Sequence, residues 1–422
     1  MKGNKMNIRK FIEKIGPLKK IAKKSYLKKR QKLYKKLSAS SVTDKKLVVF
    51  ESYQGRSYSC SPKAIYEYMS SAPDYSDYKF IWVFRDIQSH GSFAANTKTV
   101  EFDSKDALKA YACAGTWITN SRIRDFIIPR SDQQYIQCWH GTPFKKIGCD
   151  IEAGGNATSS VDEIHEEYMN EALRVTKMIS PSAFCTSKLI SAFGLDKISK
   201  ENIIIQKGYP RNDALFCLTD EKIQSIKDKL NIADKRVILY CPTFRDNQFN
   251  EHGYTLDMKL DLDQLLDQLG ENTVILFRAH YFITQQFDFN KYEGKVIDVS
   301  GYDDINDLYA ASDILITDYS SVFFDFACLN KPIIFYHYDL EDYKTKMRDF
   351  YFGTAMLPGP IANTQEKLTE LVKAALDNIN KGGNGLLRHQ KTMDAFNKRF
   401  NSLNGPDCAK KVADEIFKAD LE

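Results

Sequence analysis

The sequence lacks the features that mark a secreted or membrane-spanning protein. Its nine cysteines are widely spaced, with no C-x-x-C pair and no cysteine and histidine cluster at zinc-ligand spacing, so we expect neither a disulfide framework nor a structural metal site. No run of eighteen apolar residues is present, and the N-terminus has neither the apolar core nor the cleavage site of a secretory signal. We therefore expect a protein that stays inside the cell, in a reducing compartment.

Common nucleotide-binding and hydrolase motifs are also missing. The chain has no G-x-x-x-x-G-K-[ST] phosphate loop, no G-x-G-x-x-G dinucleotide fingerprint and no G-x-S-x-G nucleophile elbow. Apolar residues, in contrast, are plentiful: of the 422 residues 43% are hydrophobic and 12% aromatic, which excludes a disordered protein. This length is sufficient for two or three domains, each with a core of its own.

Positive charge is concentrated at the N-terminus. Residues 1–37 hold fifteen lysines and arginines and one acid, Glu13, so their balance is +14 and the rest of the chain must sum to −9 to reach the overall +5. Apolar residues recur there at helical spacing, which predicts one or two basic amphipathic helices. These residues are Ile8, Phe11, Ile12, Ile15, Leu18, Ala22, Leu27, Leu33, Tyr34 and Leu37.

Such a basic helix can bind an anionic membrane surface, and each basic residue adds roughly 1 kcal/mol to the attraction. A solvated or oligomer-contacting helix is the alternative. An arm that binds nucleic acid is disfavoured, because no basic groove with interleaved aromatic residues follows it.

From residue 46 onward, short β-rich runs alternate with helical patterns, which predicts parallel sheets covered by helices on both faces. The first series contains "KLVVFES", "YKFIWVF", "TWITN" and "QYIQCW". The second starts near residue 236 and contains "RVILYCPT", "NTVILFRAH", "GKVIDV", "DILITDY" and "KPIIFYH". Two open α/β domains in series predict a cleft between them, with ligands bound at the carboxyl ends of the strands.

The segment "QYIQCWHGTPFKKIG" places His140 at such a strand end. A histidine with an ordinary pKa near 6.5 can accept a proton from a hydroxyl at cytoplasmic pH, so His140 is a candidate general base, with a packing role as the alternative. The letters "TPFKK" predict a helix that begins with Thr142 as N-cap and a proline at the first helical position. Lys145 and Lys146 would then lie in its first turns, where they could attract an anionic acceptor or simply be solvated.

Two further strand ends carry residues suited to phosphate. In "LFRAHY", Arg278 and His280 are two apart on a strand and therefore share a face; an ion-paired arginine beside a structural histidine is the alternative. In "DILITDYSS", Ser320 and Ser321 precede a helix, where hydroxyls and free N–H groups bind anions or merely cap the helix. Asp318 would repel phosphate, so we assign it to hydrogen bonds within the turn.

Taken as an ordered set, several segments resemble the CDP-glycerol glycerophosphotransferase family, whose members build teichoic acids and related capsular polymers. The similarity extends from about residue 46 to residue 420. It is carried by "ESYQGRSYSCSPKAIYEYM", "CWHGTPFKKIG", "YPRND", "PTFRD", "RAHY", "YDDINDLYAASDILITDYSSVFFDFA" and "LPGP". The C-terminal stretch "FNSLNGPDCAKKV" departs from the family pattern, in which a tryptophan and a glycine-bearing loop are usual.

The resemblance implies an α/β, GT-B-like fold, in which two Rossmann-like domains face a cleft and terminal helices cross back. The predicted divisions are a basic membrane-associating segment over 1–40, an acceptor domain over 41–215, a CDP-alditol-binding domain over 216–395 and terminal helices over 396–422.

The resemblance also implies roles for single residues. His140 matches the family's proposed general base, and His280 matches the histidine that contacts the diphosphate of the donor. Ser320 and Ser321 match its phosphate-binding turn, with Arg278 as a further diphosphate contact. Additional candidate contacts of the donor or acceptor are Gly141, Thr142, Lys145 and Arg245.

The implied reaction is transfer of glycerol phosphate or ribitol phosphate from a CDP-alditol to a polyprenyl-diphosphate-linked saccharide or growing chain, with release of CMP. It would take place at the cytoplasmic face of the membrane. The sequence identifies no cofactor and no metal-ligand cluster. A glycosyltransferase of GT-B type that uses a nucleotide sugar is the alternative enzyme, and a membrane-surface scaffold without activity is the alternative outside enzymes. The choice of alditol, of priming or polymerisation and of polymer type, the metal requirement and the oligomeric state stay open.

Overall fold

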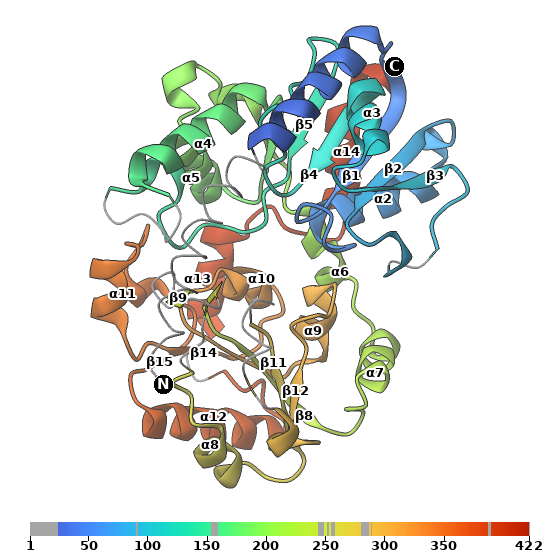
Figure 1. Ribbon diagram of the computed structural model, residues 1–422. Helices are drawn as coiled ribbons and strands as arrows, with labels where there is room; N and C mark the ends of the chain where they lie inside the picture. Colours follow the sequence, from blue (N-terminus) through green and yellow to red (C-terminus); the bar gives the residue numbers. More distant parts are fainter. Residues whose placement is uncertain are drawn as a thin grey trace, which may run out of the picture.

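The computed structural model describes residues 24–89, 92–152, 159–243, 249–250, 253–254, 258–279, 287, 289–386 and 390–421. These residues form two α/β halves stacked one above the other, each built on its own parallel sheet (Figure 1). The predicted fold class, two Rossmann-like units that face each other, is confirmed.

The N-terminal half is built on a seven-stranded parallel sheet of order β3-β2-β1-β4-β5-β6-β7. Its central strands are continuous apolar runs buried on both faces, as expected when helices cover both sides of a sheet. The strands are β1 (Asp44–Glu51), β2 (Lys79–Phe84), β3 (Thr97–Glu101), β4 (Ala114–Thr119), β5 (Gln134–Gln137), β6 (Lys177–Ser180) and β7 (Ile204–Gln206). The helices of this half are α2 (Cys60–Ser71), α3 (Lys105–Cys113), α4 (Val161–Arg174) and α5 (Ala183–Phe193).

The C-terminal half repeats this architecture with a six-stranded parallel sheet of order β12-β11-β8-β13-β14-β15. Its strands are β8 (Arg236–Cys241), β11 (Thr273–Phe277), β12 (Val296–Asp298), β13 (Ile314–Thr317), β14 (Ile333–Tyr336) and β15 (Ile361–Ala362), and β9 (Phe249–Asn250) and β10 (Gly253–Tyr254) form a separate hairpin. Its helices are α6 (Asp213–Phe216), α7 (Asp220–Lys229), α8 (Leu262–Gln268), α9 (Ile305–Ala311), α10 (Val322–Ala327), α11 (Leu340–Lys346), α12 (Gln365–Asn380) and α13 (Gln390–Phe400).

Local sequence signals account for the ends of several helices. Ser160 and Glu163 form a reciprocal capping box at the start of α4, which satisfies two backbone N–H groups that the helix itself leaves unpaired. Gly194 ends α5 in the left-handed conformation, at φ +61°, which a residue with a Cβ rarely adopts.

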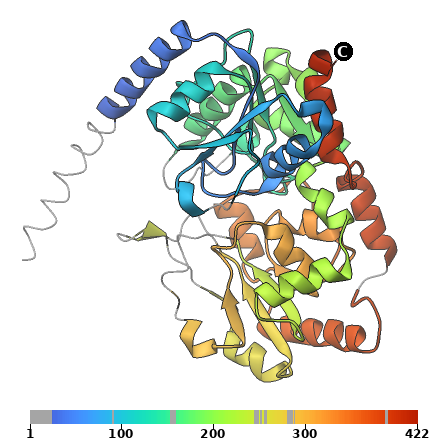
Figure 2. The same cartoon turned by 90° about the vertical axis from the view of Figure 1, so that its right-hand side faces the viewer.

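The last helix returns to the N-terminal half. Helix α14 (Cys408–Leu421) lies in the upper half in Figure 1, and Figure 2 shows the red C-terminal helices running along one side of the molecule from one half to the other. Phe417 packs edge-on against Tyr75 and Tyr78, with ring centroids 5.8 and 5.4 Å apart, and belongs to the core of the first sheet. The chain therefore connects its two halves twice.

Residues 24–40 are helical and pack against the N-terminal half. Tyr34 is buried and its hydroxyl donates to the carbonyl oxygen of Ile128 at 2.9 Å, while Leu33 and Leu37 pack against the same core. The apolar side of this helix is thus used within the molecule, and its lysines face outward. The exposed lysines are Lys24, Lys28, Lys29, Lys32, Lys35 and Lys36. The predicted apolar face from Ile8 to Ala22 lies outside the described residues.

Candidate active site

A cavity of about 1440 Å³ lies between the two halves, at the carboxyl ends of both sheets. Residues that follow β1, β4 and β5 line one side, and residues that follow β8, β11, β12 and β13 line the other. The cavity is lined by seven of the predicted site residues: His140, Gly141, Thr142, Lys145, Arg278, Ser320 and Ser321. Two predicted residues, Arg245 and His280, lie outside the part of the chain that the structure describes.

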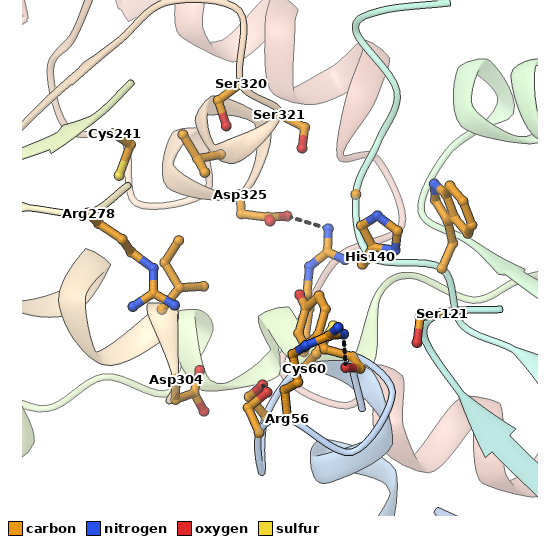
Figure 3. A pocket seen from close by; sticks show the side chains of 18 of the residues that line it. Arg56, Cys60, Ser121, His140, Cys241, Arg278, Asp304, Ser320, Ser321 and Asp325 are labelled. Carbon is orange, nitrogen blue, oxygen red and sulfur yellow. Dashed lines mark hydrogen bonds and ion pairs between the residues drawn. The ribbon is translucent and has the colours of Figure 1, made fainter. Parts of the chain in front are cut away.

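His140 follows β5 on a loop of the N-terminal half, and Ser320 and Ser321 belong to the facing C-terminal half (Figure 3). The residue before it, Trp139, has a positive φ of +50°, a conformation that is costly for a residue with a Cβ. The side-chain oxygen of Gln137 accepts a hydrogen bond from the Trp139 backbone N–H at 3.0 Å, and its amide donates to buried Glu171 at 2.9 Å. This buried network holds the turn that aims His140.

The geometry around the His140 ring leaves one nitrogen able to take a proton. Its Nδ1 lies 2.8 Å from the carbonyl oxygen of Asn120, which can only accept, so Nδ1 carries the hydrogen and Nε2 keeps its lone pair. The ring is open to the cavity but otherwise enclosed by protein, and this burial lowers the pKa of His140, helped by the nearby charges of Arg211 and Arg122. The histidine is therefore a neutral imidazole at neutral pH.

The prediction of a helix after His140 is wrong. Residues 141–147 are not helical, and Lys145 instead forms an antiparallel bridge with Phe350 of the C-terminal half. The Lys146 backbone N–H donates to Asp349 and the Tyr351 N–H donates to the carbonyl oxygen of Phe144, both at 2.9 Å. Thr142 consequently caps no helix.

The reason for this extended course is the burial of Phe144. Its ring stacks on Phe350 at 4.4 Å and 5°, meets Phe323 and Phe352 at 5.4 and 5.0 Å, and is only 1% exposed. Burying an aromatic side chain stabilises more than the short helix turn that the local sequence favours. An N-terminal loop is thus anchored in the C-terminal core, four residues after His140.

Gly141 brings the His140 loop into contact with the serine turn. A Cβ placed on Gly141 would lie 2.8 Å from the Ser321 hydroxyl oxygen and 3.3 Å from its Cβ. A side chain at this position would force the Ser321 hydroxyl to move. Gly141 thus lets the His140 loop and the serine turn lie close together at one end of the cavity.

The serine turn has the local structure that the sequence predicts. Strand β13 ends at Thr317, and the Asp318 carboxylate accepts hydrogen bonds from the backbone N–H groups of Thr243 and Tyr319, at 2.7 and 2.6 Å. This confirms that Asp318 serves the turn. Ser321 stands at the N-cap of α10 without a side-chain capping bond, so its hydroxyl is not committed to the helix.

Arg278 lies on the C-terminal side of the cavity, directly after β11. Its Nη1 donates to the carbonyl oxygens of Val299 and Tyr302, at 3.0 and 2.7 Å, rather than to a carboxylate. Neutral carbonyl oxygens thus hold the positive charge in place. Neither of these two bonds goes to a carboxylate, so they do not support the alternative of an ion-paired arginine.

Besides Lys145 and Arg278, the cavity contains charged residues that the sequence did not single out. Cationic side chains outnumber acidic ones by seven to four, an excess that suits a ligand with more than one phosphate. The cationic residues are Arg56, Arg85, Arg122, Lys145, Arg211, Arg278 and Arg348, and the acidic ones are Asp86, Asp303, Asp304 and Asp325. Within the described ranges, no group of three or more histidine, cysteine or acidic side chains is placed to hold a metal ion.

Backbone conformation is a second feature of the site that residue type could not reveal. Besides Trp139, the cavity residues Tyr53, Gln54 and Cys60 have positive φ values of +48°, +58° and +66°. Non-glycine residues in this region are uncommon and gather where function requires an exact geometry. The first of them lies beside the base, since the Tyr53 and His140 rings are 5.9 Å apart.

A comparison with protein families agrees with the motifs. A family profile described as CDP-Glycerol:Poly(glycerophosphate) glycerophosphotransferase matches residues 33–418. The chain is 36% identical over 427 residues to a teichoic acid poly(glycerol phosphate) polymerase of Bacillus subtilis, of which it spans 54%, so it covers about half of that relative's length.

Other relatives are covered more fully. A teichoic acid glycerol-phosphate transferase of Staphylococcus aureus is 36% identical over 384 residues, which are 90% of this chain and 95% of that protein. A solved structure of the wall teichoic acid polymerase TagF superposes with a TM-score of 0.82 at 34% identity, covering 98% of each chain.

Proposed function

Because the chain belongs to the CDP-glycerol:poly(glycerophosphate) glycerophosphotransferase family, we propose that it transfers glycerol phosphate or ribitol phosphate from a CDP-alditol to an acceptor hydroxyl, with release of CMP. The acceptor would be a polyprenyl-diphosphate-linked saccharide or a growing teichoic acid or capsule chain. One observation carries this proposal: a neutral histidine with a free Nε2 and a phosphate-suited serine turn line the same cation-rich cavity.

In the proposed reaction, the acceptor hydroxyl oxygen attacks the phosphorus that bears the alditol. A new oxygen–phosphorus bond forms, the bond between this phosphorus and the CMP oxygen breaks, and the hydroxyl proton passes to Nε2 of His140. His140 is placed for this step because its Nδ1 hydrogen is held by Asn120.

Phosphoryl transfer depends mainly on positioning and on stabilisation of charge, and the C-terminal side of the cavity would supply both. Arg278, Ser320 and Ser321 would bind the diphosphate of the donor, together with His280 as the family resemblance implies. The net positive lining would offset the charge that develops on departing CMP.

A nucleotide-release assay tests the proposed reaction. Purified protein with a lipid-linked acceptor analogue should release CMP from CDP-glycerol or CDP-ribitol, and mass spectrometry should find the acceptor heavier by one or more alditol phosphates. A glycosyltransferase would instead release UDP from a UDP-sugar. If no CMP appears with either CDP-alditol, and a UDP-sugar is consumed, the proposal is wrong.

We further propose that the basic N-terminal segment docks the protein on the cytoplasmic face of the membrane, where its lipid-linked acceptor would lie. The support is the row of outward-facing lysines on residues 24–40, whose apolar side is occupied by the protein's own core. Across the described part of the chain, no helix combines the length and apolarity that crossing a bilayer requires. Docking would therefore rest on charge and on the segment before residue 24.

Changing Lys28, Lys32 and Lys35 to glutamine is expected to weaken binding to vesicles rich in phosphatidylglycerol by about 100-fold, since each basic residue adds roughly 1 kcal/mol. Vesicle sedimentation measures this. Substitution is preferable to deletion of the first 40 residues, which would remove buried Tyr34. The matched control changes three exposed lysines of the opposite half, Lys367, Lys373 and Lys381. Equal loss of binding in both variants would refute docking through this helix.

A further inference from the structure

Arg211 is a buried cation that lines the cavity and has no role in the reaction as proposed so far. It lies in a short turn at Pro210–Asn212, after β7, and is 5% exposed. Its Nη2 donates to Asp325 Oδ1 at 2.9 Å, the ion pair marked by the dashed line from Asp325 in Figure 3. Its Nε and Nη1 are buried and have no hydrogen-bond partner in the described structure.

Both halves of the molecule hold Arg211 in this place. Its backbone N–H donates to the Ser61 hydroxyl at 3.4 Å, its carbonyl oxygen accepts from the Asn306 side chain, and its guanidinium stacks on the Tyr209 ring at 4.1 Å. The bonds to Ser61 of the N-terminal half and to Asn306 in α9 of the C-terminal half fix the backbone of Arg211. The Tyr209 ring and the Asp325 carboxylate hold its side chain, which cannot turn out to solvent without losing both contacts. The two unpaired nitrogens, Nε and Nη1, are therefore a fixed feature of the cavity.

Two free donors on a buried cation are costly unless a ligand satisfies them. The carboxylate that pairs with Arg211 is already shared, because Asp325 Oδ1 also accepts from the Asn212 amide at 2.8 Å. An oxyanion with several oxygens would complete the coordination of Arg211, and guanidinium groups match phosphate oxygens well.

The position of Arg211 indicates which phosphate this is. Arg211 lies near enough to His140 for its charge to act on that ring, and its partner Asp325 belongs to α10, the helix that begins directly after Ser321. Arg211 thus lines the same cavity as the base and, through Asp325, is tied to the helix that follows the phosphate-binding turn. This cavity is where a phosphorus atom would lie while the acceptor oxygen approaches it and CMP departs.

We propose that Arg211 is a catalytic residue that donates hydrogen bonds from Nε and Nη1 to the non-bridging oxygens of the phosphoryl group under transfer. This assignment rests on the proposed phosphotransferase reaction and completes it. The acceptor oxygen bonds to phosphorus, its proton goes to His140, the bond to the CMP oxygen breaks, and Arg211 stabilises the charge on the equatorial oxygens without itself gaining or losing a proton.

The test is the variant Arg211→Ala, assayed for turnover, for CMP binding and for rescue by guanidinium. Loss of one preorganised donor group typically lowers kcat by about 10² to 10³, so that decrease is expected here. The dissociation constant of CMP should stay within about threefold, because CMP contains none of the transferred phosphoryl group. Added guanidinium chloride should raise the kcat of Arg211→Ala at least about tenfold, because the ion fills the space that the side chain leaves. This increase should saturate as the guanidinium concentration rises.

The matched control is Arg236→Ala, which removes an arginine at the start of β8, the end of the sheet away from the cavity. Guanidinium should stimulate neither this variant nor the wild-type protein. If Arg211→Ala does not fold, as judged by circular dichroism, Arg211→Lys keeps the charge but lacks the planar donors, and its kcat should fall at least about tenfold.

The outcomes separate this inference from the reaction it depends on. A wild-type protein that releases no CMP from either CDP-alditol would remove the proposed function. A wild-type protein that releases CMP, with Arg211→Ala or Arg211→Lys turning over at the same rate, would overturn the role of Arg211 alone. Folded Arg211→Ala that guanidinium does not rescue, or whose loss lies entirely in CMP affinity, would also overturn it.

Discussion

Replacing His140 with alanine is expected to lower kcat by about 10² to 10⁴, the usual contribution of a general base, while the affinity for the CDP-alditol stays close to that of the wild-type protein. The physical reason is that alanine has no imidazole, so the variant loses the Nε2 that would accept the proton and that the bond from Nδ1 to Asn120 holds in place. Steady-state kinetics together with calorimetric titration of CMP separates the two quantities.

The matched control is His165→Ala. His165 lies on α4, outside the cavity, and its Nε2 also contacts a backbone carbonyl oxygen, that of Ile151, at 2.8 Å. It therefore reproduces the loss of an imidazole and a hydrogen bond without touching the site. A His140→Ala variant that turns over as fast as the control would refute the assignment of the base.

The pH dependence follows from the same residue. Burial and the charges of Arg211 and Arg122 lower the pKa of His140 below the usual value near 6.5, so the ring stays unprotonated and competent as a base at neutral pH. We expect kcat/KM to be level near neutrality and to fall only as the pH drops through this lowered pKa. A profile whose acidic limb lies above pH 6.5 would show that another group titrates.

Replacing Phe144 with alanine is expected to destabilise the protein by about 3 to 5 kcal/mol, because it leaves a cavity among three phenylalanine rings of the C-terminal half. It should also lower kcat by about tenfold or more, since the loop that carries His140 loses its anchor and small displacements of a catalytic group are costly. Denaturant titration followed by intrinsic fluorescence, and turnover measured well below the denaturation midpoint, check the two effects.

Two substitutions control for Phe144→Ala. Phe144→Leu keeps most of the buried volume and should recover much of the stability and turnover. Phe216→Ala removes a phenylalanine that is 41% exposed and should change stability by less than about 0.5 kcal/mol. If Phe144→Ala proves destabilised but fully active, then the loop is held by its backbone bonds to residues 349–351 and not by the ring.

Much of the fold could be predicted because its elements are strongly patterned. The apolar runs predicted as strands form β1, β4, β8 and β13. Because strands buried on both faces need consecutive apolar residues, such runs can be recognised in the sequence. The short edge strand β3 alternates partly exposed residues and carries too weak a pattern for recognition. The order of strands within each sheet is decided by packing and could not be read at all.

Some residues of the candidate site could be predicted from the sequence and others could not, again because only local patterns are visible in a sequence. His140, Arg278, Ser320 and Ser321 could be found because chemistry in open α/β sheets gathers at strand ends, and strand ends are local. A role for Arg211 could not be predicted from the sequence, because its burial in the cavity depends on an ion pair with Asp325, which lies 114 residues later in the chain. The helix predicted from "TPFKK" was wrong for the same reason: the partners of Phe144 lie about 200 residues away.

Sequence alone determined the family, the two α/β units and the residue types available for phosphate chemistry, since these depend on local pattern and on ordered motifs. Only the tertiary structure decided that His140 and the serine turn share one cavity and that Gly141 makes room for their approach. It also decided that Arg211 lines this cavity with two nitrogens, Nε and Nη1, left unpaired. The physical reason is that such relations are distances between the two halves, and close packing sets those distances where local propensity has no influence.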